Sequence, residues 1–98
     1  MGQPVTRLGD KTTGHGPYLP RPSTGASGDV FVNGLGVVRV GDTWAPHKGV
    51  PPGVHSGETG ITSAGSGTVF ANGKAVARIG DPVEADTIAA GSANVFAG

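Results

Sequence analysis

The sequence predicts a small all-β domain with pseudo-threefold symmetry, built from three hairpin repeats and containing little or no helix. Three observations carry this prediction: an internal repeat, an Asn-Gly dipeptide at the centre of each full copy, and a composition rich in turn residues. Gly supplies 19 and Pro 8 of the 98 residues. No window shows a sustained helical period with caps, and the prolines interrupt the candidates.

The repeat appears as two full copies and two half-copies. Residues 28–42 align without gaps on residues 67–81. Near the chain ends, residues 5–10 match residues 37–42, and residues 91–97 match residues 65–71. Half, one, one and half make three units, and a fixed repeat implies one structural unit packed on copies of itself. We therefore expect the two terminal halves to pair in space, which closes the body and brings the chain ends together.

Each full copy has the pattern of a β-hairpin. A β-branched apolar run is followed by Asn-Gly at residues 33–34 and 72–73, and then by a second apolar run. Asn-Gly is the strongest short hairpin signal, because a type I′ turn needs positive φ at both central residues. In the second run Val37 and Val38 are both apolar, so we expect both faces to be covered. Gly-Asp closes each copy, and we expect loops to begin there.

An arginine stands at the same place before each Gly-Asp. Its three occurrences are Arg7, Arg39 and Arg78. A repeated arginine can bind an anion or a partner, but we expect ion pairs or backbone hydrogen bonds that hold each corner of the repeat.

Composition restricts the classes of function. The whole chain, 1–98, has room for one domain, and its few bulky apolar residues make a thin core. Such scaffolds usually need a disulfide, a metal or a partner, and the chain has no Cys. Seven basic residues balance seven acidic ones, which disfavours nucleic acid as a partner. The N-terminus resembles no signal peptide, so we expect a protein made in the cytoplasm and exported, if at all, by another route.

The histidines suggest a metal site. His15 and His47 follow Asp10 and Asp42 at the same distance, so they occupy equivalent places in the repeat. Pseudo-threefold symmetry would bring such positions towards a common axis, where imidazoles bind zinc at about 2.0–2.1 Å. His55 lies in the same loop as His47. The third loop has no His, but it offers the carboxylates of Glu84 and Asp86. The competing interpretation is three ordinary histidines in exposed loops.

Two other functions compete with a structural one. A three-His centre with an open position can activate water, which makes a small metalloenzyme, a hydrolase, the main alternative. The chain has neither a His-Glu-x-x-His pair nor a Gly-x-Ser-x-Gly elbow, so we predict that it is not an enzyme. A carbohydrate- or envelope-binding module ranks last, because only Tyr18 and Trp44 qualify as exposed aromatics for it.

These motifs resemble the PAAR-repeat family, whose members form the spike tips of contractile phage tails and type VI secretion systems. Gly-Val-Val-Arg at 36–39 and Ala-Val-Ala-Arg at 75–78 are altered forms of the Pro-Ala-Ala-Arg motif, and each precedes an aliphatic residue and Gly-Asp. Residues 67–73 and 91–96 are similar to the family pattern Gly-Ser-x-x-Val-Phe-x-Asn-Gly. Residues 12–16 look like the first ligand loop of the family.

The resemblance implies a short cone with a zinc or iron ion near its vertex. The usual ligands of the family are three His and one Cys. His15, His47 and His55 match the His positions in order. The Cys is absent, and Glu84 is our prediction for its place, with Asp86 as the alternative.

The resemblance also implies a function. The base of the cone would sit on the threefold end of a trimeric β-helical spike, one chain per trimer, and sharpen it for piercing the target cell envelope. We expect a monomer on its own, with no effector extension. Its place would be the phage virion or the tip of a type VI secretion apparatus. The short length without an effector favours the phage.

Overall fold

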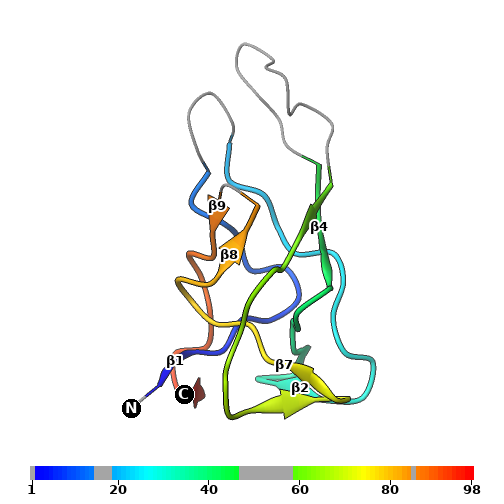
Figure 1. Ribbon diagram of the computed structural model, residues 1–98, viewed down its shortest axis with the longest axis vertical. Coiled ribbons are helices and arrows are strands. Elements are labelled where there is room, and N and C mark those ends of the chain that lie inside the picture. Colours follow the sequence, from blue (N-terminus) through cyan, green and yellow to red (C-terminus); the bar gives the residue numbers. More distant parts are fainter. Residues whose placement is uncertain (1, 15–18, 47–58, 85) are drawn as a thin grey trace.

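The structure is a computed structural model that describes residues 2–14, 19–46, 59–84 and 86–98. In this part of the chain, ten two-residue strands form five antiparallel pairs, and there is no helix, hence none that could span a membrane. Figure 1 shows one layer of strand pairs at the lower end of the molecule and further strands above it. The predicted all-β class is confirmed.

The two Asn-Gly dipeptides form hairpin turns as expected. Strand β2 (Phe31–Val32) pairs with β3 (Leu35–Gly36), and β6 (Phe70–Ala71) pairs with β7 (Lys74–Ala75). Both turn residues have positive φ in each hairpin: 55° and 79° in residues 33–34, and 55° and 77° in residues 72–73. These are the angles for which Asn and Gly are suited.

The chain ends complete a third hairpin-like unit. Strand β1 (Gln3–Pro4) pairs with β10 (Phe96–Ala97), so that Pro4 faces Phe96. Phe31 faces Gly36 and Phe70 faces Ala75 in the same register. In Figure 1 the two ends of the chain lie close together at the lower end of the molecule. The predicted pairing of the terminal half-copies is confirmed.

The second run of each unit leaves its own hairpin and joins the next unit. Three equivalent bridges link the units in a cycle: Arg7 with Val37, Arg39 with Val76, and Arg78 with Val5. Just beyond them, backbone amides and carbonyls of Thr6, Val38 and Ala77 form a closed ring of three hydrogen bonds, 2.8 to 3.1 Å long. All three residues are fully buried. Each unit is therefore held by both of its neighbours.

This ring separates two small apolar clusters, as the consecutive apolar residues of the second runs predicted. Val37 and Val38 are neighbours in the chain but belong to different clusters, because successive residues of an extended segment point to opposite sides. The base cluster comprises Val5, Val37, Ala71, Val76 and Ala97. The upper cluster comprises Val38, Trp44, Ala77, Val83 and Ile88.

The expectation that loops begin after each Gly-Asp was wrong. The chain turns there through glycines at positive φ, such as Gly41 at 92°, and immediately starts a second set of strand pairs. Strand β4 (Thr43–Trp44) pairs with β5 (Gly60–Ile61), and β8 (Pro82–Val83) pairs with β9 (Asp86–Thr87). In the first unit, the bridge between Lys11 and Pro22 takes the same place. Further bridges connect these upper pairs: Ser23 with Trp44, Thr62 with Val83, and Thr12 with Ile88.

Candidate functional site

The connections of the three upper strand pairs contain four predicted metal ligands, His15, His47, His55 and Glu84, while the alternative, Asp86, begins β9. These connections comprise residues 13–20, 45–59 and 84–85. His15, His47 and His55 lie outside the described residues, so their convergence stays a prediction. Bridges between the upper pairs bring the strands that carry these connections next to one another. Figure 1 shows β4, β8 and β9 above the layer of β1, β2 and β7.

Glu84 is the one predicted ligand within the described residues. It is exposed in the turn between β8 and β9, with φ of 56°. Apart from glycines, the other positive φ values of the described residues belong to Asn33 and Asn72, which suit this conformation. Glu does not, and holding it there costs on the order of 1 kcal/mol. Its carboxylate has no hydrogen-bond or ion-pair partner in the described part of the chain.

Asp86, the alternative ligand, is engaged in a buried ion pair. Its Oδ2 lies 3.4 Å from Nε of Arg21, and the two side chains are 0% and 2% exposed. Strand pairing places Arg21, Gly60 and Asp86 at equivalent positions of the three upper pairs. A Cβ on Gly60 would lie only 2.5 to 2.7 Å from the Arg21 guanidinium. The glycine therefore makes room for an arginine that reaches from the first unit to the third.

Arg21 is not among the residues that the sequence predicts to be functional. Comparing the repeats could not have found it, because the three equivalent residues are a cation, a glycine and an anion. A possible signal was the compensating charge of Arg21 and Asp86, but nothing in the local sequence indicates that the two residues meet.

The recurring arginines hold corners of the fold, as expected. Arg7, Arg39 and Arg78 each pair with the aspartate three residues later, at 3.0, 2.8 and 3.0 Å. Their pKa values are raised, chiefly by the hydrogen bond to this aspartate. Each also donates from Nη1 to a side-chain oxygen of another unit; the acceptors are Asn33, Asn72 and Gln3. These guanidinium groups are occupied by the protein itself.

Trp44 does not offer an exposed aromatic surface. It is fully buried in the upper cluster, and its indole Nε1 donates to Oγ1 of Thr62 at 2.8 Å. The hypothesis of a carbohydrate-binding module thereby loses one of its two aromatics. The other, Tyr18, lies outside the described residues.

The base presents three equivalent apolar faces to the exterior. Phe31, Phe70 and Phe96 occupy the same place in each unit and are 57%, 58% and 55% exposed. Val30, Val69 and Val95, just before them, are 38%, 40% and 36% exposed. Of the ten large hydrophobic side chains exposed in the described residues, seven belong to these base units, which makes the base the main apolar surface there.

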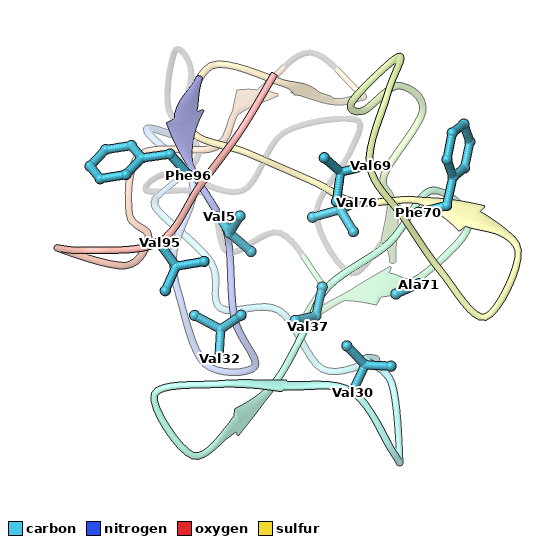
Figure 2. Close-up of a pocket in the computed structure, with 10 residues that line it drawn as sticks. All are labelled: Val5, Val30, Val32, Val37, Val69, Phe70, Ala71, Val76, Val95 and Phe96. Carbon is cyan, nitrogen blue, oxygen red and sulfur yellow. The ribbon is translucent and has the colours of Figure 1, made fainter. Parts of the chain in front are cut away.

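A hollow of about 120 Å³ lies at the centre of this base. Figure 2 shows valines from all three units around it, with Phe70 and Phe96 directed outward at the periphery. Its described lining consists of Val, Ala and Phe alone. A hollow of this composition suits an apolar group and offers no partner for a charge.

Comparison with known proteins adds one match. A family model described as PAAR motif matches residues 13–90. No curated protein sequence matches the chain.

Proposed function

Since the chain belongs to the PAAR motif family, a family of spike-tip proteins, we propose that it caps the threefold end of a trimeric β-helical spike. In this role it sharpens the spike for piercing the target cell envelope, and it acts mechanically and not as an enzyme. The place of action we propose is the tail tip of a contractile phage, with a type VI secretion apparatus as the alternative.

The observation that carries this proposal is the base. Three equivalent apolar faces surround one hollow at one end of a single chain. An exposed apolar surface of this kind marks an interaction site, because leaving it in water is costly. A closed trimer presents three identical contacts about one axis. One pseudo-threefold chain therefore fits one trimer.

The interlocked units suit a part that transmits force. Every unit bridges to both neighbours, and the ring of Thr6, Val38 and Ala77 closes this cycle. The arginine–aspartate corners tie each unit to another one. A load along the axis is thus shared by three connected units.

We further propose that a metal stabilises the end opposite the base, as zinc or, alternatively, iron. His15, His47, His55 and Glu84 would hold it. Glu84 supports this set: it is exposed, has positive φ and has no partner among the described residues, and a non-glycine residue in an unfavourable conformation is typical of functional positions. Asp86 fits less well, since its carboxylate is paired with Arg21. The bound ion would add its binding free energy to the stability of a thin fold.

The stoichiometry of binding tests the cap. The protein is mixed with purified trimeric spike proteins, and the complex is weighed by native mass spectrometry. We expect one chain per trimer. Saturation at three chains per trimer, or no binding to any spike, would overturn the proposal.

Metal analysis tests the stabilising ion and separates it from a hydrolytic one. We expect His15→Ala to lose bound metal and to unfold at a markedly lower temperature, whereas Thr13→Ala, in the same connection, keeps both. A His15→Ala protein that loses metal but keeps its melting temperature would contradict a stabilising role. It would favour the metalloenzyme.

A further inference from the structure

Some positions of the base hold the same residue in all three units and others do not. This difference indicates which residues contact the trimeric partner. We compare three sectors: residues 27–38, residues 66–77, and residues 92–97 together with 3–6. Some positions are identical in all three sectors, namely Val30, Val69 and Val95; Phe31, Phe70 and Phe96; and Val37, Val76 and Val5. Others differ in chemistry, namely Asp29, Thr68 and Asn94, and Leu35, Lys74 and Gln3.

A threefold partner explains why some positions must be identical. Its three chains are the same, so each sector of the cap meets the same partner residues, and rotation by a third of a turn gives an equivalent complex. A partner residue that packs against Leu35 would meet Lys74 in the next sector. An interface core tolerates such an exchange poorly, because it would bury a charge without a partner. Positions that differ among sectors therefore belong outside the contact.

Exposure supports the same division. The three phenylalanines are more than half exposed, yet all three sectors keep a phenylalanine there. Leu35 is 41% exposed and equally apolar, but its equivalents are Lys and Gln. The stability of the fold does not explain why all three sectors have a phenylalanine at this position, since exposed side chains contribute little to stability.

Resting on the proposed function, we infer that the cap contacts its trimer through the sector-identical Val and Phe positions. The central hollow takes an apolar cluster to which each of the three partner chains contributes equally on the partner's axis. The sector-variable positions form a rim outside this contact. We infer an apolar occupant with threefold symmetry because the hollow has an apolar lining and lies among all three sectors.

The test compares matched variants with a purified trimeric spike protein that binds the wild-type chain. Phe31→Ser, Phe70→Ser and Phe96→Ser should each weaken binding about tenfold, and to the same extent, because the three contacts are equivalent. Leu35→Gln, which also removes an exposed apolar side chain from the base, should leave the dissociation constant unchanged. Val69→Thr, nearly the same shape, tests the hollow and should also weaken binding. Melting temperatures confirm that each variant is folded.

The outcomes separate this inference from the proposed function. If the wild-type chain binds no trimer, the proposed function falls and this inference falls with it. If the wild-type chain binds but Leu35→Gln weakens binding as much as the phenylalanine variants, the cap stands and the contact map is overturned. Unequal effects of the three phenylalanine variants would also overturn the map. So would self-association of the free chain that is lost in Phe70→Ser while trimer binding is unchanged, since the face would then bind a second copy.

Discussion

The base and the upper layer of this protein are both built from the repeat, but only the base keeps a set of identical Phe and Val residues in all three units. In the base, two hairpins and the paired termini share one register and the same Phe and Val positions. In the upper layer, the connections comprise residues 13–20, 45–59 and 84–85, so they differ widely in length. The three equivalent buried positions there hold Arg21, Gly60 and Asp86.

This difference shows where symmetry is needed. An outer surface that meets a threefold partner must repeat itself, whereas a buried interior need only fill its own space. In the upper layer, a large residue in one unit is balanced by a small one in another, as with Arg21 over Gly60. The base should therefore matter for binding, and the upper layer for stability.

Replacement of Trp44 should destabilise the packing of the upper layer and cause the largest loss in the free energy of unfolding. The side chain is fully buried, so Trp44→Ala leaves a large cavity and an unused partner at Thr62. We expect a loss of about 4 kcal/mol in the free energy of unfolding, measured by urea titration. In a domain this small, such a loss removes much of the total stability.

An aromatic of the base provides the matched control. Phe70 is 58% exposed, and Phe70→Ala should cost less than about 0.5 kcal/mol. Comparable losses for Trp44→Ala and Phe70→Ala would contradict the division of roles between the two layers.

Replacement of Asp86 should have the next largest effect. Asp86→Ala leaves the Arg21 guanidinium buried without its carboxylate, and removing one member of such a pair costs about 3 kcal/mol. The double variant Arg21→Met with Asp86→Leu removes both charges and should recover most of this loss. Urea titration of the two variants measures the difference. A double variant no more stable than Asp86→Ala would show that the charges themselves are not responsible.

The base could be predicted from the sequence because its signals are local or repeated. The turns at residues 33–34 and 72–73 need only Asn-Gly, and the pairing of β1 with β10 follows from matching half-copies. The equivalent places of His15 and His47 are likewise visible in the repeat. Their geometry is not, since it depends on connections that no repeat describes.

The upper layer could not be predicted because its contacts are neither local nor repeated. Strands β4 and β5 are separated by residues 45–59, with no short turn signal to join them. The cyclic bridges shorten the expected second strands, because residues beyond Gly36 pair with another unit. The three equivalent positions hold Arg21, Gly60 and Asp86, which share no chemistry, so the repeat does not indicate that the arginine meets the aspartate.

Replacement of each corner arginine, at the boundary between the base and the upper layer, should have an equal and moderate effect on stability. Arg39→Gln removes the pair with Asp42 and the donor to Asn72. Because the side chains are 13% and 10% exposed, we expect a loss of about 1 kcal/mol, partly screened by salt. Arg7→Gln and Arg78→Gln should lose similar amounts in the same urea titrations. A loss confined to one of the three would contradict the equivalence of the corners.

The smallest expected effect concerns one charge on the rim of the base. Hydrogen bonds from Asn72 and Ser27, with Arg39 nearby, lower the pKa of Asp29 below its ordinary value of 3.8. A lowered folded-state pKa means that the charged form stabilises the fold above the unfolded pKa. This contribution is lost as the pH falls through the lower, folded-state pKa. Asp29→Asn should therefore lower the melting temperature slightly near neutral pH, and the difference should vanish in acid.

The third sector supplies the converse of this experiment. Asn94 accepts hydrogen bonds from Asn33 and Ser92, just as Asp29 accepts them from Asn72 and Ser27. Asn94→Asp should consequently gain the same slight stabilisation at neutral pH and lose it in acid, measured by the same melting curves. If Asn94→Asp and Asp29→Asn shift the melting temperature in the same direction at neutral pH, the hydrogen-bond donors do not stabilise a negative charge at this position. Opposite shifts, together with unchanged binding to the trimer, would place this position in the fold's own rim and outside the contact.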